Sequence, residues 1–220
     1  MTIPRALLDY TPLIPPVLKN HLDFTESEAE QYYKWFLANV DSRADYLRNY
    51  ISLKQNIPQD KLDFSLDSLI IIWEWFLSVA LVEKVSGEEL ENVRKRYEGV
   101  PQPMFEHLVE QNSLRLSTTT EYILFDIGMY AAKLFTRSYP CLKWKLKLKP
   151  KRDVNANLPV IIGFVDDDPD YEKPFYPELN PVDLVRTPAM KLIRDPSDVP
   201  AKDDLFGWCK MWVEWIPRNN

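Results

Sequence analysis

Hydrophobic residues are most concentrated over Asp63–Lys84, where the sequence reads DFSLDSLIIIWEWFLSVALVEK. Across the 14 positions 69–82 only Glu74 and Ser78 are polar. This run is shorter than the roughly 20 apolar residues that a membrane-spanning helix needs, and an acid lies in its middle. The pattern therefore predicts a buried helix that forms the axis of a protein core.

A second helix is predicted to begin after Thr25. Thr25 and Glu28 form a T-x-x-E capping box, in which each side chain satisfies a backbone N–H group at the start of the helix. Apolar residues then recur at helical spacing as far as Ile51. The polar pair Asp41–Ser42 marks a position where this helix is expected to bend or break.

A third helix is predicted over Thr118–Arg137, TTTEYILFDIGMYAAKLFTR, with Thr118 and Glu121 as its capping box. Gly128 and the alanines at 131 and 132 remove side-chain bulk from part of this helix, so another helix can approach closely there. The natural neighbour is the helix over Asp63–Lys84.

The hydrophobic period changes from helical to alternating after Pro140. Leucine and tryptophan alternate with lysine over 142–149, which predicts a strand with one solvated face. The apolar stretch 159–165 predicts a second strand, and the polar linker between them suits an antiparallel hairpin. The remainder is rich in proline, with a short helix near 182–193 and a final helix over 203–216.

These elements predict an α+β fold in which a helical core carries a small antiparallel sheet and a Pro-rich C-terminal region. A chain of 220 residues can bury a sizeable core, and we expect one domain over 1–220. Tryptophan, tyrosine and phenylalanine together make up 13% of the chain, enough to supply large buried faces.

Charge and targeting signals narrow the class of protein. The formal net charge is −6, which makes nucleic acid an unlikely partner and favours a basic one. The N-terminus shows no signal segment, so a cytoplasmic protein without a membrane partner is expected. Cys141 and Cys209 lie far apart within apolar patterns and are expected to be buried free thiols, although a single disulfide between them stays open.

Several common chemistries lack the residues that they need. The five glycines are scattered, so neither a Walker A loop nor a dinucleotide-binding fingerprint is present. The only histidines are His21 and His107, and no Cys/His cluster has the spacing of a zinc site. We therefore expect no cofactor and no metal.

Glu74 and Asp126 are the two acidic residues expected within buried helices. A carboxylate placed between Trp73 and Trp75 would have a raised pKa and could act as an acid or base, as in a hydrolase-like enzyme. The competing interpretation is structural: Glu74 shares a narrow stripe with Asp67 and Ser78 that faces water. A pocket that encloses Glu74 and Asp126 together would favour the enzyme.

Two segments are candidates for partner binding. The first is a dense acidic turn after the second strand, made up of Asp166, Asp167, Asp168 and Asp170. Its alternation resembles a calcium loop, but Tyr171 and Pro177 stand where that loop needs glycine and glutamate. A solvated turn or a surface for a basic partner is therefore favoured.

The second segment is the final helix, where Trp208, Trp212 and Trp215 form a stripe at helical spacing. Core packing is the default interpretation of such a stripe, and an exposed patch through which a regulatory subunit docks is the alternative. The lysines at 143, 145, 147 and 149 are interpreted as a solvated face that protects an edge strand rather than as an RNA-binding surface.

The segments LDFSLDSLIIIWEWF, YILFDIGMYAAKLFTR and LKWKL together resemble a pattern in small bacterial cytoplasmic proteins, mostly uncharacterised. Some of these are regarded as immunity proteins of toxin systems. Ala132–Lys133 stands near the place of a Gly-Glu pair in that pattern. The resemblance concerns packing and carries over no catalytic residue; it implies a non-enzymatic protein that neutralises a toxin by binding it.

Overall fold

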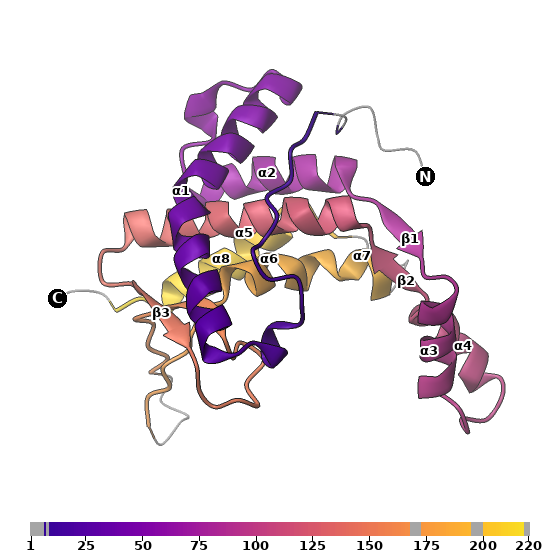
Figure 1. The fold of residues 1–220 in the computed structure, drawn as a ribbon. Helices are drawn as coiled ribbons and strands as arrows, with labels where there is room; N and C mark the ends of the chain where they lie inside the picture. The colour runs from indigo at the N-terminus through magenta and orange to yellow at the C-terminus, as the bar shows by residue number, and fades with distance from the viewer. Residues whose placement is uncertain (1–6, 8, 168–172, 195–199, 218–220) are drawn as a thin grey trace.

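Helix α5 (Thr118–Ser138) lies at the centre of the fold, with other helices on several sides of it (Figure 1). The structure is a computed structural model, and it describes residues 7, 9–167, 173–194 and 200–217. Twelve α5 residues are buried, against seven in α2 (Leu66–Val79). The prediction that the helix after Asp63 forms the core's axis is therefore wrong, because α5 holds that position.

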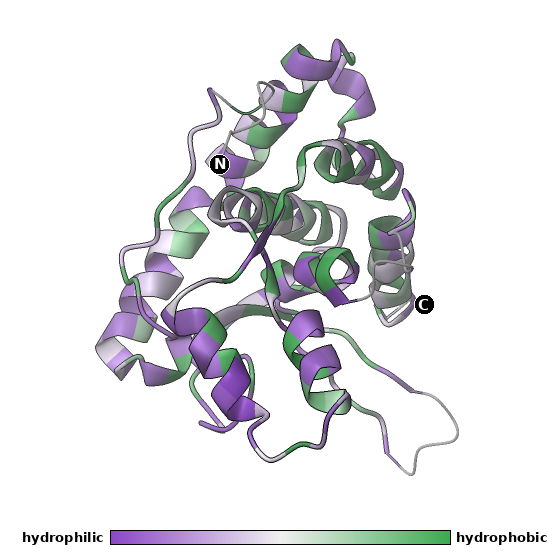
Figure 2. Ribbon diagram, turned by 90° about the vertical axis from the view of Figure 1, so that its right-hand side faces the viewer, coloured by the Kyte–Doolittle hydropathy of each residue, from purple (hydrophilic) through white to green (hydrophobic). Residues whose placement is uncertain are grey.

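The predicted α+β class, mostly helical with a small antiparallel sheet, is confirmed. The remaining helices and strands are η2 (His21–Asp23), α1 (Glu26–Gln55), η3 (Gln59–Lys61), β1 (Val82–Lys84), α3 (Glu88–Arg96), α4 (Met104–Gln111), β2 (Leu114–Leu116), β3 (Lys143–Lys147), β4 (Leu158–Ile162), α6 (Pro181–Ala189), α7 (Lys191–Arg194) and α8 (Asp204–Glu214). Hydrophobic residues gather on the helices at the centre of the molecule (Figure 2).

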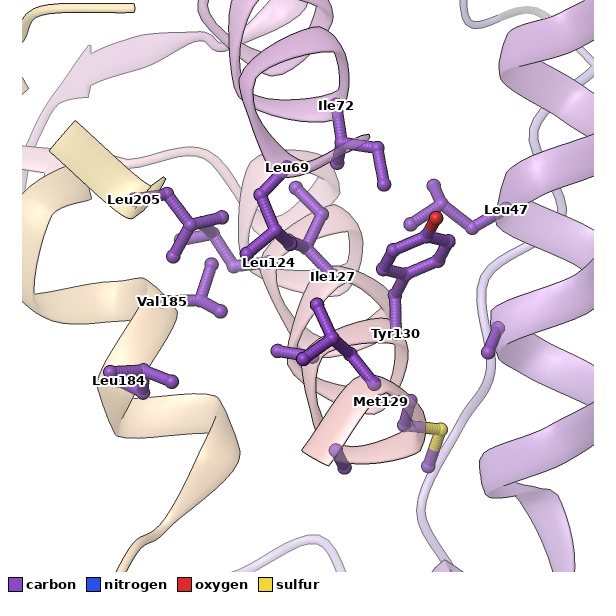
Figure 3. Packing of buried hydrophobic residues seen from close by; sticks show 14 of the residues in the cluster. Leu47, Leu69, Ile72, Leu124, Ile127, Met129, Tyr130, Leu184, Val185 and Leu205 are labelled. Atoms are coloured by element: carbon purple, nitrogen blue, oxygen red, sulfur yellow. The ribbon is translucent and has the colours of Figure 1, made fainter. Parts of the chain in front are cut away.

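The core is built by α1, α2 and α6, which pack against α5, and by α8, which packs against α2 and α6. Figure 3 shows buried side chains of these helices gathered around α5: Leu124, Ile127, Met129 and Tyr130 of α5, Leu69 and Ile72 of α2, Leu47 of α1, Leu184 and Val185 of α6, and Leu205 of α8. Burying each large aliphatic side chain contributes roughly 1.5–3 kcal/mol. The fold therefore depends on apolar packing around one helix.

Helix α1 begins as the sequence predicts. The Thr25 side chain accepts a hydrogen bond from the Glu28 N–H group, and the Glu28 carboxylate accepts one from the Thr25 N–H group at 2.7 Å. The bend expected at Asp41–Ser42 is absent, because α1 continues through both residues to Gln55. Both lie on the exposed side, so they do not interrupt packing.

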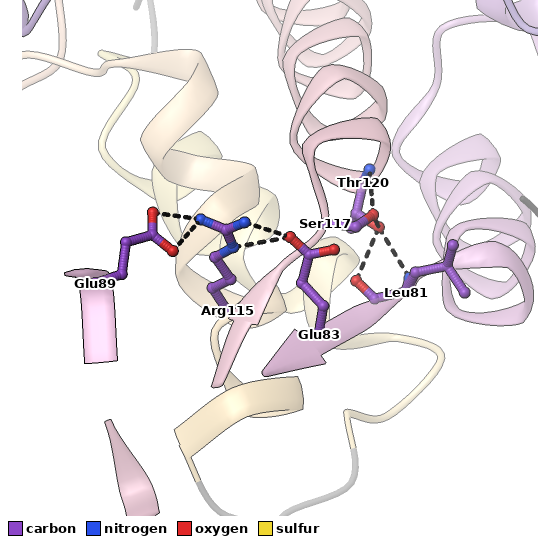
Figure 4. Close-up of polar contacts among 6 residues, drawn as sticks. All are labelled: Leu81, Glu83, Glu89, Arg115, Ser117 and Thr120. Atoms are coloured by element: carbon purple, nitrogen blue, oxygen red, sulfur yellow. Dashed lines mark hydrogen bonds and ion pairs between the residues drawn. The ribbon is translucent and has the colours of Figure 1, made fainter. Parts of the chain in front are cut away.

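Helix α2 is shorter than its hydrophobic run, because the chain switches to a strand after Val79. The Leu81 N–H group donates to the Thr120 hydroxyl at 2.8 Å, and the Leu81 carbonyl accepts from the Ser117 N–H group at 2.9 Å (Figure 4). Residues 82–84 then pair antiparallel with 114–116. Hydrophobicity alone could not show this change, since Ala80, Leu81 and Val82 continue the apolar run beyond the end of the helix.

The start of α5 differs by one residue from the predicted cap. Ser117, not Thr118, is the N-cap, and its hydroxyl accepts a hydrogen bond from the Thr120 N–H group at 3.2 Å. Ser117 is buried while Thr118 is exposed, so tertiary contacts with Leu81 select the serine. The predicted capping box of Thr118 with Glu121 is therefore wrong.

Gly128 permits a close approach, but its neighbour is α6 rather than α2. A Cβ atom added at Gly128 would lie 2.9 Å from the Val182 Cα atom and 3.0 Å from the Pro181 carbonyl oxygen. Both are backbone atoms at the start of α6, which cannot move aside alone. The small residue on α5 therefore seats the N-terminal turn of α6.

The predicted hairpin forms, with β3 and β4 paired antiparallel from Lys143 opposite Ile162 to Lys147 opposite Leu158. Ile161 also makes an isolated antiparallel bridge with Leu179, with two hydrogen bonds of 2.8 Å. The Pro-rich region is thereby held against β4.

Helices α3 and α4 form an arm that projects from the body beyond the β1–β2 pair (Figure 1). Arg115 at its base donates to Glu83 at 2.8 Å and to Glu89 of α3 at 2.5 Å (Figure 4). Helix α3, which consists mostly of charged residues, lies on the surface, since none of its residues is buried.

Both cysteines are free thiols, but only Cys209 is buried. Cys141 is exposed at the turn before β3, so the expectation of burial is wrong for that residue. Among the described residues, no helix combines the length and the apolar character needed to cross a membrane.

Exchanging glycine for alanine at two helix positions should have opposite effects. Gly128→Ala forces the α5–α6 contact apart and should lower the free energy of unfolding by about 1–3 kcal/mol. Gly207→Ala in α8 is the matched control, because nothing lies within 4 Å of its added Cβ atom. There, alanine should be neutral or stabilise by up to about 1 kcal/mol. Urea denaturation measures both, and equal effects would contradict the α5–α6 contact.

The two thiols should differ in their reaction with a thiol reagent such as DTNB. Cys141 should react rapidly in the native protein, whereas Cys209 should react only after unfolding, because it is fully buried and burial raises the pKa of its thiol. Spectrophotometric titration with and without denaturant counts them. Rapid reaction of two thiols in the native state would refute the placement of Cys209.

Candidate functional site

The acidic turn begins a loop that is closed at its base. Asp166 pairs with Phe175 through two backbone hydrogen bonds of 2.8 Å, an isolated antiparallel bridge. Asp167 follows on the exposed side. Asp168 and Asp170 lie outside the described residues. The described residues at the base of this loop lie below β3 in Figure 1.

Two aromatic side chains stand exposed on the return segment of this loop. Phe175 is 60% exposed and Tyr176 is 67% exposed. Sequence reasoning missed them because a Pro-rich segment has no hydrophobic period. Their only signal is local: in the run Pro-Phe-Tyr-Pro, prolines on both sides keep the backbone extended. Tyrosine and phenylalanine are enriched at protein-binding surfaces relative to the rest of the protein surface.

Helix α8 presents its three tryptophans unequally. Leu205 and Cys209 form its buried side. Trp208 is 38% exposed, while Trp212 and Trp215 are half-buried and pack edge to face with ring centroids 5.0 Å apart. Trp208 is therefore the one tryptophan of this helix that is available to a partner.

The acidic turn and α8, the two segments predicted to bind a partner, contact each other in the structure. The Val165 N–H group donates to the Trp215 carbonyl oxygen at 2.7 Å. One residue earlier, the Phe164 ring packs edge to face on Trp212 at 4.9 Å. The start of the acidic turn is thus fixed to the end of α8, although Val165 and Trp215 are 50 positions apart in the sequence. Nothing in the sequence indicated this contact.

A hollow of about 500 Å³ lies between α6, α8 and the segment that follows Tyr176. Leu184, Trp208 and Trp212 give it apolar walls, and Arg186 and Arg194 bring positive charge to it. Arg186 also donates to Glu121 at 2.8 Å. This volume is in the range of small-ligand pockets and is large enough for a few side chains of a partner.

Two of the alternating lysines over 143–149 form ion pairs instead of facing only solvent. Lys145 and Lys147 both make ion pairs with Glu178, at 2.7 and 2.6 Å, and Lys147 also pairs with Asp153 at 2.7 Å. Burial alone would raise the pKa of Glu178, but the two lysines outweigh it and hold that pKa below its ordinary value. The positive charge of β3 is therefore largely neutralised by the segment that lies against it.

Asp126 is fully buried and forms the centre of a polar cluster. Arg43 donates to both carboxylate oxygens, with a distance of 2.9 Å from Nε to Oδ1, and the Tyr10 hydroxyl donates to Oδ2. Arg43 also donates to the Thr11 carbonyl at 2.9 Å and lies 4.1 Å from the centre of the Tyr46 ring. The cluster ties α1, α5 and the N-terminal segment together.

The polar cluster around Asp126 stabilises the fold and is not placed to act on a substrate. Burial raises the pKa of Asp126, against the effect of Arg43 and Tyr10, and burial also raises the pKa of Tyr10 well above its ordinary value. Because the Asp126 side chain has no exposed surface and is already hydrogen-bonded on both oxygens, it has no face left for a substrate.

Glu74 is exposed, so its interpretation as a buried acid is wrong. Residues adjacent in a helix point about 100° apart, so burial of Trp73 and Trp75 does not bury the residue between them. Asp67, Glu74 and Ser78 are all exposed, which confirms the stripe that faces water. Glu74 and Asp126 do not share a pocket, because one is exposed and the other has no exposed surface.

Among the described residues, no group of three or more histidine, cysteine, aspartate or glutamate side chains is placed to hold a metal ion. The residues gathered at the acidic loop and α8 can supply aromatic contacts, carboxylates and two arginines.

Comparison with known proteins adds no family to this picture: no family model, no curated protein and no solved structure matches the chain.

Removing the charge of Asp126 should strongly destabilise the protein. Asp126→Asn leaves Arg43, whose side chain is 11% exposed, without its anion, which should cost about 3–5 kcal/mol. Glu30→Gln is the control, because the Lys34–Glu30 pair is solvent-exposed at 3.8 Å and should contribute less than about 0.5 kcal/mol. Chemical denaturation compares the two variants. A small effect of Asp126→Asn would show that the cluster does not lock the fold.

Proposed function

We propose that this chain is a non-enzymatic binding protein of the cytoplasm whose partner is a basic protein. The observation that carries the proposal is the surface formed by the acidic loop and α8. We call it the loop–α8 surface and define it by Asp166, Asp167, Phe175, Tyr176 and Trp208.

The composition of the loop–α8 surface supports a protein partner. Interface hot spots are enriched in tryptophan and tyrosine, and exposed aromatic side chains gain the most from burial. Phe175 and Tyr176 on the loop are 60% and 67% exposed, and Trp208 on α8 is 38% exposed. The base of the loop is held by the Asp166–Phe175 bridge and the contact to α8, so binding orders little backbone.

Charge supports a basic partner. The chain has a net charge of −6, and Asp166 and Asp167 lie beside the exposed aromatics. Complementary charge raises association rates and disfavours wrong partners, more than it increases affinity. The aromatic side chains would then provide most of the binding free energy.

The more specific proposal is that the partner is a toxin and that this chain is its immunity protein. It rests on the sequence resemblance described above. The positions of Glu74 and Asp126 are compatible with a protein that acts by binding and not by catalysis. Glu74 is exposed, and Asp126 is hydrogen-bonded to Arg43 and Tyr10.

Affinity purification from the native host, followed by reconstitution, tests the proposal. A tagged chain should retain one partner stoichiometrically at low salt and moderate salt, and the partner should be basic. With both proteins purified, the double variant Phe175→Ser/Tyr176→Ser should weaken binding at least about tenfold. Asp167→Asn should instead slow association and reduce its dependence on salt.

Leu53→Ser is the matched control for the aromatic variants. Leu53 is 82% exposed near the C-terminal end of α1, and this end of α1 lies on the opposite side of the molecule from β3 (Figure 1). This variant should bind as the wild type does. If the partner is a toxin, it should arrest growth when expressed alone, and the wild-type chain but not the double variant should restore growth. Absence of a stoichiometric partner, or equal binding by all variants, would refute the proposal.

A further inference from the structure

A second hollow, of about 520 Å³, lies on the side of α6 that faces α1 and the N-terminal segment. We call it the α1–α6 hollow. Its floor is aromatic, made by Phe24, Tyr32, Phe36 and Phe125. Asp183 of α6 also lines it. The loop–α8 surface does not include any of these residues.

The Tyr32 hydroxyl in this hollow is unused. Tyr32 is only 9% exposed, and its ring packs against Phe24 and Phe36 with centroid distances of 5.7 and 6.3 Å. In the part of the chain that the structure describes, its hydroxyl makes no hydrogen bond. The hydroxyl oxygen is not itself enclosed by protein, so a ligand group in the hollow can hydrogen-bond with it.

Asp183 offers a second unused polar group. The Asn180 side-chain amide donates to one of its carboxylate oxygens at 3.0 Å. Its other oxygen accepts no hydrogen bond from the described residues. Burial raises the pKa of Asp183, against the opposing charges of Arg186 and His21. Asp183 and Tyr32 both line this hollow, and the charge of Asp183 adds to burial in raising the pKa of Tyr32.

The cations at the rim of the hollow already have partners. Lys19 pairs with Glu28 at 2.8 Å, and Arg186 pairs with Glu121 at 2.8 Å. The His21 Nε2 atom lies 2.8 Å from the Val154 carbonyl oxygen. Asp183 is therefore the charge of the hollow that is least compensated, and it favours a cation over an anion.

We propose that the α1–α6 hollow binds an organic cation, an ammonium or guanidinium group carried on an apolar or aromatic body. The cation pairs with the Asp183 carboxylate and donates to the Tyr32 hydroxyl oxygen, while the aromatic floor receives the body. Charge-assisted hydrogen bonds and cation–π contacts are the interactions by which proteins select such groups.

This chemistry has two sources: a free amine, or a lysine or arginine side chain of a partner. The free-amine source is independent of the proposed function. The side-chain source rests on that function, since the partner proposed there is basic. Small probes measured on the isolated protein test the hollow itself, so a failure here is distinguishable from a failure of the loop–α8 surface.

Isothermal titration calorimetry with four probes tests the proposal. 2-Phenylethylamine represents a free amine, and the Nα-acetyl N-methylamides of lysine and arginine represent side chains of a partner. 2-Phenylethanol is the uncharged counterpart of the first probe. At least one cationic probe should bind, and 2-phenylethanol should bind at least about tenfold more weakly than 2-phenylethylamine if the amine is the ligand.

Two variants assign the binding to the hollow. Asp183→Asn keeps the side-chain shape and should weaken the cation about 10- to 100-fold, and Tyr32→Phe keeps the ring and should weaken it about 2- to 10-fold. Asp60→Asn, which removes an exposed carboxylate in η3, should have no effect. Thermal unfolding of each variant checks that the fold is retained.

The outcomes separate the two sources. Binding of 2-phenylethylamine alone identifies a free amine, and binding of the lysine or arginine derivative alone identifies a partner side chain. Binding of both supports the shared chemistry. No binding by any cation at millimolar concentration, equal binding of 2-phenylethanol, or unchanged binding by both Asp183→Asn and Tyr32→Phe would overturn the proposal.

Discussion

Helix α5 is enclosed on nearly all sides, and that enclosure decides how the other elements are placed. A charged or polar side chain on a buried helix needs a neighbouring group that pairs with it, and the space left by a glycine needs a neighbour that fills it. Asp126 is compensated by Arg43 of α1 and by Tyr10, so α1 and the N-terminal segment must lie across α5. Gly128 is compensated by the backbone of α6. Thr120 hydrogen-bonds with Leu81, so the end of α2 lies at the start of α5. Apolar packing supplies the free energy, and these three contacts select one arrangement among many apolar ones.

The same contacts position both surfaces that we assign to binding. Because Gly128 admits the first turn of α6 so closely, Asn180 is held nearly buried beside it, where its side chain caps α6 and donates to Asp183. The two hollows lie on either side of this turn and share the residues Asn180, Asp183 and Arg186. Helix α8 then closes the first hollow, and its end anchors the acidic loop through Val165. The contact of Gly128 with α6 in the core thus fixes the positions of Asn180, Asp183 and Arg186, which line the two hollows.

Local features of this fold were readable from the sequence, and contacts between distant segments were not. The capping box at Thr25, the hairpin after Pro140 and the solvated stripe through Glu74 each follow from residues within one helical turn or one strand pair. The end of α2 was missed because Ala80, Leu81 and Val82 prolong its hydrophobic run. The cap of α5 was missed because a contact with Leu81 favours Ser117 over Thr118. The acidic and tryptophan segments were recognised separately, but only the fold brings them together. Phe175 and Tyr176 were missed because exposure in an extended segment leaves no period to detect.

Arg186 connects the electrostatics of the two hollows. It lines both, its guanidinium donates to Glu121, and its charge lowers the pKa of Asp183 against the effect of burial. A cation that pairs with Asp183 adds positive charge close to this arginine, which makes the first hollow more favourable to an acidic group and less favourable to a basic one. Binding free energies are reciprocal, so an acidic group bound near Arg186 in the first hollow strengthens cation binding in the second by the same factor. The shared turn of α6 is therefore a physical route by which occupation of one hollow changes the affinity of the other, without any change in fold.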